Sequence, residues 1–443
     1  MSQPYSPDAP PTSRIRLLLF AVWLVLTLGG VVFVLVLGSN APYADEWEFV
    51  PALVGEEPLG PWLWMQHNEH RLPLPRLLYF TLFQVTHDFR TGMLLQVLLL
   101  SAMSLGLMQL TARLRGKPLW ADAFFPISLL HLGHWENFIM GYQICFTLFA
   151  VFVTGLVVVA LRTTRENAFR SGACAAVLVF LTALTGSSGL ALVPPVAAWM
   201  AYLAVLLWNA GAKGKSLTLL ALALMLLAYI GLYFSGYARP TGHPPLSHDL
   251  QAIGEVTGVV LSLGVGVSVS QVWPVIAAGE VLLGLATVVF LVRRPREEWP
   301  ASAGLIAVAA GVFGLALTLG LARAEWGAEV VGQWSRYSLL TWPLLGAAYL
   351  VWAKAGRKWL PMGLCALAAL AFPANMLTGL QNGTAIRASI MSLEVDARAG
   401  MPASYVVRRH LTGSGQEERA LRGIPLLRAA GIGAFAGKPD ANP

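Results

Sequence analysis

Charged residues are scarce in this sequence. Only 12% of its 443 residues are Asp, Glu, Lys or Arg, whereas 56% are hydrophobic and the mean hydropathy is +0.63. Apolar runs of about 20 residues, long enough to cross the hydrocarbon core of a bilayer as a helix, recur along the chain. This composition excludes a soluble globular protein and predicts an all-α, polytopic helical membrane protein.

Cysteine is also rare. The three cysteines, Cys145, Cys174 and Cys365, all lie inside apolar runs, which excludes a disulfide framework and a cysteine-based metal site. No repeat of fixed period is visible. The net charge of +7 comes mostly from basic residues in short connections between apolar runs. That distribution is typical of the positive-inside rule and gives no indication of nucleic-acid binding.

The apolar runs predict about eleven transmembrane helices, with the N-terminus in the cytoplasm. The first run, 17–37, follows Arg14 and Arg16 and is too long for the core of a signal peptide, so we interpret it as an uncleaved anchor. The other crossings are expected at about 91–110, 119–132, from 141 to Arg162, 172–184, before Lys213, before Ser235, at 272–292, 301–321, before Lys354 and at 359–379. Of the 30 basic residues, this topology places sixteen inside, six in outer loops and eight in an outer C-terminal tail.

Two domains follow from this topology: a transmembrane domain, residues 1–379, and the tail, residues 380–443. The tail is expected to be partly helical around 392–410 and loose from Gly413 onward. The segment 251–292 permits two crossings, or one crossing preceded by an interfacial or re-entrant piece. Charge bias favours one crossing, because two would place the arginines that follow residue 292 outside.

The first outer loop, residues 39–90, contains the densest group of titratable side chains. Six of the chain's 23 acidic residues lie within residues 43–71. In an otherwise apolar chain, such a concentration is where catalytic chemistry is expected. Within the loop, residues 59–65 mix aromatic and aliphatic side chains, which predicts a short helix lying at the membrane interface.

Polar residues from several connections are predicted to reach the same membrane face. They are Asp45, Glu46, Glu69, His70, His134, Glu136, Arg239, His243, Arg323 and Arg336. Outer loops are polar in most membrane proteins, so a solvated turn remains the alternative interpretation of Asp45 and Glu46.

Two pairs of histidines are spaced three residues apart. His67 with His70, and His131 with His134, would share a face if they were helical, and imidazoles in that arrangement can bind zinc. Hydrogen bonding or substrate binding explains the same residues. The sequence therefore requires no cofactor, and a divalent metal stays open.

Arg336 and Glu280 are notable for their positions. Arg336, beside Tyr337 at the outer end of an expected span, is either a headgroup anchor or a phosphate clamp, since guanidinium binds phosphate in a forked geometry. Glu280 lies inside an apolar run, where a charge costs roughly 2.5–3.5 kcal/mol on insertion. We expect Glu280 to be protonated or paired with another helix.

The order of these features resembles the GT-C superfamily of membrane glycosyltransferases. A cytoplasmic N-terminus, one span and a first outer loop that opens with Asp-Glu are similar to protein O-mannosyltransferases and lipid A aminoarabinose transferases. Asp45 matches the catalytic acid of that loop, and Glu46 matches its usual neighbour. The stretch 71–75, Arg-Leu-Pro-Leu-Pro, is similar to a substrate-facing basic and proline stretch, although Lys-Pro-Pro is absent. Ser335-Arg336-Tyr337 resembles an arginine-tyrosine element of bacterial members.

The resemblance implies transfer of a sugar from a polyprenyl-phosphate donor to an acceptor hydroxyl on the extracytoplasmic face of a bacterial-type plasma membrane. The acceptor is a lipid, a polysaccharide or a protein. Asp45 and Glu46 are the expected catalytic residues. The expected substrate-binding residues are Glu69, His70, Arg71, His134, Glu136, Arg239, Arg323, Arg336 and Tyr337. Two alternatives stay open: a transporter or flippase of lipid-linked sugars, with Glu280 as a coupling site, and a surface-polysaccharide polymerase or ligase.

Overall fold

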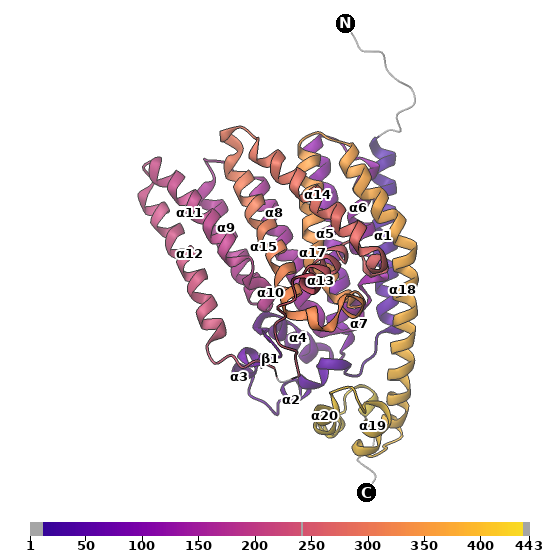
Figure 1. The fold of residues 1–443 in the computed structure, drawn as a ribbon. Coiled ribbons are helices and arrows are strands. Elements are labelled where there is room, and N and C mark those ends of the chain that lie inside the picture. Colours follow the sequence, from indigo (N-terminus) through magenta and orange to yellow (C-terminus); the bar gives the residue numbers. More distant parts are fainter. Residues whose placement is uncertain (1–11, 241, 437–443) are drawn as a thin grey trace.

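The computed structural model describes residues 12–240 and 242–436. Residues 1–11, which were expected in the cytoplasm, and residues 437–443, the end of the expected outer tail, lie outside this range. The described chain is almost entirely helical, with one two-stranded antiparallel sheet (Figure 1). Eight helical stretches within it are long and apolar enough to cross a membrane. The protein is therefore an integral helical membrane protein, as its composition predicts, while the number of eleven crossings stays a prediction.

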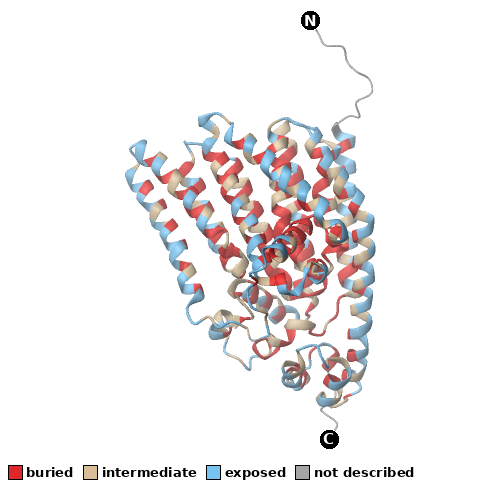
Figure 2. Ribbon diagram, viewed as in Figure 1, coloured by how far each residue is buried: buried red, intermediate tan, exposed pale blue. Residues whose placement is uncertain are grey.

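The long helices form a bundle. They are α1 (Thr12–Leu37), α5 (Arg90–Arg115), α8 (Ile144–Leu161), α11 (Val193–Asn209), α12 (Lys213–Phe234), α14 (Trp273–Val292), α15 (Trp299–Arg323) and α18 (Trp359–Arg398). Shorter helices complete it: α9 (Ala168–Ala183), α13 (Leu250–Ser262) and α17 (Ser338–Lys354). Figure 2 shows exposed residues along the outward sides of α12 and α18. Leu224 and Leu370, which are 65% and 80% exposed, are examples of the apolar side chains that such helices present to lipid.

The expected crossing at 119–132 is wrong as a continuous helix. The chain there forms short pieces: η2 (Trp120–Ala123), α6 (Phe124–Leu129), η3 (Leu132–His134) and α7 (Trp135–Ile139). The break has a packing reason. Gly133 lies so close to α18 that a side chain there would meet the Asn375 amide oxygen at 2.6 Å. This short approach to α18 suits a chain that turns here instead of continuing as one straight helix.

The segment 251–292 contains one long helix. The 13-residue α13 and the 3₁₀ helix η5 (Val267–Val272) precede α14. Asn375 also stabilises this irregular region, because its side-chain oxygen accepts a hydrogen bond from the backbone N–H of Ser268 at 3.0 Å. This arrangement agrees with the interpretation of one crossing preceded by a shorter piece.

The C-terminal region is more ordered than the sequence predicts. Helix α18 continues past residue 379 as far as Arg398 and is followed by α19 (Ala403–His410), α20 (Glu417–Ala429) and η9 (Gly433–Phe435). The expectation of a loose chain from Gly413 onward is therefore wrong for the described residues up to 436. We call residues 399–436 the C-terminal segment. It lies at one end of the bundle (Figure 1, yellow).

The 39–90 segment folds at this same end (Figure 1). Its elements are η1 (Ala44–Glu48), α2 (Val50–Leu53), α3 (Leu59–Trp64), β1 (Gln66–His67), β2 (His70–Arg71) and α4 (Pro73–Thr86). A distinct apolar core joins it to the C-terminal segment, with Trp47 and Val50 on one side and Ile424 and Phe435 on the other. The connections η4 (Gly141–Gln143), α10 (Ser187–Leu190), η6 (Arg296–Glu298), η7 (Ala324–Trp326), α16 (Ala328–Val331) and η8 (Ser335–Tyr337) complete the described elements.

Candidate functional site

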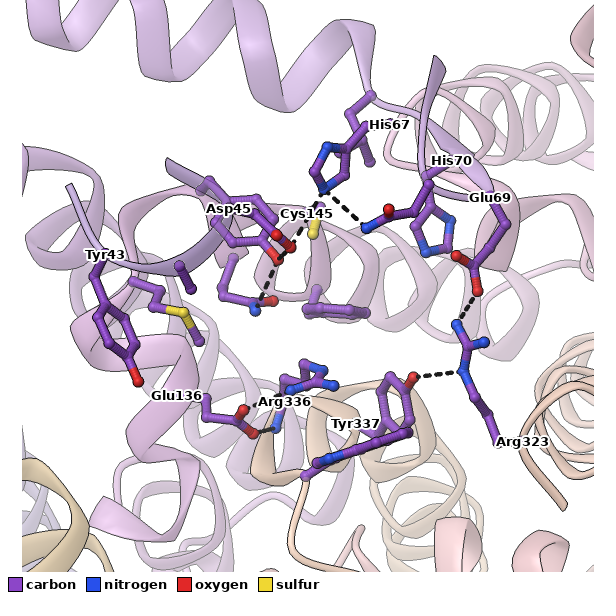
Figure 3. Close-up of a pocket in the computed structure, with 18 of the residues that line it drawn as sticks. Tyr43, Asp45, His67, Glu69, His70, Glu136, Cys145, Arg323, Arg336 and Tyr337 are labelled. Carbon is purple, nitrogen blue, oxygen red and sulfur yellow. Dashed lines mark hydrogen bonds and ion pairs between the residues drawn. The ribbon is translucent and has the colours of Figure 1, made fainter. Parts of the chain in front are cut away.

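A cavity of about 360 Å³ lies between the 39–90 segment and the ends of the bundle helices. Figure 3 shows two walls. Asp45 and His67 are on one wall, while Glu136 and Arg336 are on the opposite one. We call these the loop wall and the arginine wall. Seven of the eleven predicted site residues line the cavity: Asp45, Glu69, His70, Glu136, Arg323, Arg336 and Tyr337.

Asp45, on η1, is the central carboxylate of the loop wall. Its Oδ2 accepts a hydrogen bond from the Tyr142 hydroxyl at 2.8 Å, and its Oδ1 accepts one from the Gln416 side-chain amide at 3.1 Å. The His67 Nε2 lies 3.4 Å from Oδ2. Burial alone would raise the pKa of Asp45, but His67, Tyr142 and the charge of Arg419 together hold that pKa well below its usual range. Asp45 is therefore a carboxylate at any physiological pH.

His67, on β1, links two carboxylates. Its Nδ1 lies 2.8 Å from Glu48 Oε2, and its Nε2 faces Asp45. Burial alone would lower the pKa of His67, but these two acids raise it to about 9. An imidazolium between two carboxylates keeps both in place and cancels part of their charge.

Glu46 is adjacent to Asp45 but points away from the cavity. Its side chain is fully buried. It accepts hydrogen bonds from the backbone N–H of Tyr43 at 3.0 Å, the Tyr79 hydroxyl at 2.9 Å and the backbone N–H of Gly141 at 2.8 Å. Burial raises the pKa of Glu46 from 4.5 to about 7. Glu46 therefore fixes η1 against α4 and η4 and does not line the cavity.

Arg336, on η8, is the central cation of the arginine wall. Its Nη1 lies 2.6 Å from Glu136 Oε1, and its backbone N–H donates to Glu136 Oε2 at 2.9 Å. The guanidinium carbon lies 4.7 Å from the Trp334 ring centroid, a cation–π contact. Its side chain keeps 26% exposure. Within the described chain, its other N–H groups have no hydrogen-bond partner, so one guanidinium edge remains available to the cavity.

Arg323, at the end of α15, is more fully engaged. It pairs with Glu69 through Nη2 and lies 3.2 Å from His243 through Nη1. Its Nε donates to the Tyr337 hydroxyl at 3.3 Å. These contacts connect α15, η8, the 39–90 segment and the loop that contains His243. Arg323 thus shapes the cavity without offering a free edge.

Comparison with models of known families, with curated protein sequences and with solved structures finds no match. An ionised carboxylate on one wall and an available guanidinium edge on the other can receive a proton and an anion, respectively.

Glu46 and three other predicted site residues do not line the cavity. Arg71 is buried and donates to the carbonyl oxygens of Trp64, Tyr233 and Ser235, so it anchors the loop to α12. His134 is buried, with one ring nitrogen 2.6 Å from the Ser338 hydroxyl. Arg239 is exposed, and its guanidinium donates to the Pro244 carbonyl.

The histidine pairs do not take the helical arrangement that would suit a shared metal. His67 and His70 face each other across β1 and β2. The His131 and His134 rings stack with centroids 4.1 Å apart, away from the cavity. Burial and the charges of His67 and His243 lower the pKa of His70 to about 3, so its ring is neutral. Within residues 12–240 and 242–436, no group of three or more histidines, cysteines and acids is placed to hold a metal.

Sequence reasoning missed several residues of the site. Glu48 belongs to the same acidic group as Asp45, and its spacing from Asp45 on a helical turn was the available signal. The sequence contains no comparable signal for Tyr142 or Gln416. They lie 97 and 371 residues from Asp45 along the chain, and only the fold brings them to it.

Proposed function

We propose that this protein is a GT-C-type membrane glycosyltransferase. It would move a sugar from a polyprenyl-phosphate donor to an acceptor hydroxyl on the extracytoplasmic side. The observation that carries the proposal is that Asp45 and Arg336 lie on facing walls of one cavity at an end of the bundle. An acceptor hydroxyl needs a base, and the leaving phosphate needs a cation.

In the proposed reaction, the acceptor oxygen forms a bond to the anomeric carbon while the bond from that carbon to the lipid phosphate breaks. The hydroxyl proton passes to Asp45. The negative charge that grows on the departing phosphate is stabilised by the unoccupied edge of Arg336. Because the pKa of Asp45 is far below that of a hydroxyl, proton transfer follows formation of the new carbon–oxygen bond, which makes the hydroxyl acidic.

The loop wall and the arginine wall suit these two roles because each is held by its partners. Tyr142, Gln416 and His67 fix the orientation of Asp45. Glu136 and Trp334 hold Arg336 from one side only. Groups that are oriented in advance lose little freedom on binding, which favours catalysis.

The test is a transfer assay with the purified full-length protein. A polyprenyl-phosphate sugar with a radiolabel in the sugar is incubated with lipid, polysaccharide and peptide acceptors in reconstituted membranes. Appearance of labelled acceptor together with free polyprenyl phosphate is the expected result. If label moved across the membrane still attached to its lipid and no acceptor became labelled, the protein would be a flippase.

A further inference from the structure

A second cavity, of about 310 Å³, lies within the membrane-spanning part of the bundle, between α13, α14, α15 and α17. Nearly all of its lining is aliphatic. Its rim residues Val281, Leu285 and Phe313 are 39%, 57% and 45% exposed on the side of the bundle. Because this side of a membrane-spanning bundle contacts lipid, the cavity opens laterally into the bilayer. It shares no lining residue with the site described above.

Glu280, on α14, lines this cavity. Both of its carboxyl oxygens are buried, and neither has a hydrogen-bond partner within the described chain. The other hydrogen-bonding side chain in the lining, Thr287, is satisfied: its hydroxyl donates to the Leu283 carbonyl at 2.7 Å and accepts from the Trp352 indole N–H at 2.9 Å. The cavity therefore has one unmet hydrogen-bonding group.

An unpaired carboxyl in hydrocarbon is unfavourable, and acidic residues inside membrane spans normally have a partner or a function. A positively charged partner would itself have to leave water, and that desolvation offsets the attraction between the charges. A hydroxyl avoids this cost, because it is neutral and both donates and accepts hydrogen bonds. An apolar cavity with one placed polar group is also the usual form of a small-ligand site.

We infer that this cavity binds a membrane-dissolved alcohol, a lipid with an apolar body and a single hydroxyl that hydrogen-bonds to Glu280. The proposed sugar donor does not fit this description, since its polar end is a charged phosphate. The inference is independent of the proposed glycosyl transfer. A second copy of the chain covering the rim of α14 is the competing occupant.

Two glycines on α14 provide a matched pair of variants. Gly284 lines the cavity, whereas Gly279 does not, and an added side chain at either position would start in open space. Gly284→Phe should therefore fill the cavity. Gly279→Phe should leave it open while adding the same side chain to the same helix.

The experiment is photolabelling of the full chain in lipid nanodiscs. The probe is a long-chain alcohol with a diazirine in its alkyl chain, and the control probe is the matching alkane. We expect the alcohol to label α14, α15 and α17 roughly three- to tenfold more than the alkane, the effect of about one hydrogen bond. Glu280→Leu should abolish this preference, and Glu280→Gln should keep it, because an amide also donates and accepts. Gly284→Phe should abolish labelling of these helices, and Gly279→Phe should not.

Three results would overturn the inference. The first is equal labelling by the alcohol and the alkane in the wild type. The second is a full preference for the alcohol in Glu280→Leu, which would remove Glu280 from the site. The third is absence of labelling together with efficient crosslinking of two chains through Leu285→Cys at the exposed rim, which would show that a second copy occupies the rim.

Discussion

The two walls of the cavity are built in opposite ways. In the loop wall, Asp45 and His67 come from one short segment, and residues distant in the sequence, such as Gln416, complete it. In the arginine wall, Glu136 and Arg336 come from separate connections and form an ion pair with each other. The loop wall surrounds its carboxylate with donors on several sides, whereas the arginine wall leaves one edge of its cation free. In the proposed reaction, the first arrangement keeps the base ionised and the second leaves the cation free to receive an anion.

The largest expected effect is on the loop wall. Asp45→Asn keeps the size of the side chain but removes the proton acceptor, so we expect glycosyl transfer to fall by about 10²–10⁴. Donor binding should change little. Asp88→Asn is the matched control, since Asp88 lies in the same segment, pairs with Arg90 and does not line the cavity. Steady-state rates of both variants test this, and near-normal turnover by Asp45→Asn would remove Asp45 as the base.

The arginine wall should respond next. Arg336→Lys keeps the charge but loses the planar fork, so we expect transfer to fall by about tenfold to a hundredfold, as for one or two charge-assisted hydrogen bonds. Arg239→Lys serves as the control, because Arg239 is exposed and does not line the cavity. The ratio kcat/KM for the lipid donor is the measurement. Equal values for Arg336→Lys and the wild type would make Arg336 a membrane anchor.

The third prediction separates Glu46 from its neighbour through stability. Protonation of Glu46 favours the folded state, because its pKa is about 7 there and its ordinary value is 4.5. The folded protein should therefore lose stability as the pH rises from about 4.5 to about 7. Glu46→Gln cannot titrate, so its Tm should fall less over this interval than the wild-type Tm. Thermal unfolding in detergent at several pH values measures both, and parallel curves would contradict the assignment.

The smallest effect is expected from the C-terminal side of the loop wall. Arg419 lies 2.9 Å from Glu48 and 3.8 Å from Asp45 but is 37% exposed, so its removal should change transfer by about fivefold at most. Arg422→Ala is the control, because Arg422 pairs with Glu57 at 3.1 Å instead. Transfer rates of the Arg419→Ala and Arg422→Ala variants, measured at low and high salt, test this difference. An Arg419→Ala variant that is unaffected by salt and fully active would show that this contact plays no part in the reaction.

The sequence predicted the helical membrane fold and seven of the twenty residues that line the cavity for a definite reason. The length of an apolar run identifies a membrane span, and the positive-inside rule then assigns each polar connection to one side of the membrane. Asp45, Glu136 and Arg336 could therefore be placed on the same side without a structure. The direction in which each side chain of a connection points could not be predicted this way. Arg71 belongs to the predicted group, yet it turns toward backbone carbonyls.

Irregular segments escaped prediction because tertiary contacts determine them. The run 119–132 reads as one apolar span, but the chain there forms short pieces, and Gly133 directly after it approaches α18 closely. The C-terminal segment has no long apolar run, yet Ile424 and Phe435 are buried against the 39–90 segment. Neither contact leaves a periodic signal in the sequence, since each joins residues that are hundreds of positions apart.

Helix α18 has a geometric consequence for the substrate. Its 40 residues extend for about 60 Å, twice the roughly 30 Å thickness of a hydrocarbon core. A single uninterrupted rod therefore sets the height of the C-terminal segment above the bilayer, and the hydrogen bond from Ser39 to Glu394 ties that rod to the end of α1. Asp45 therefore keeps a fixed height relative to the bundle, so a thicker membrane brings the lipid surface closer to Asp45 and a thinner one moves that surface away from it.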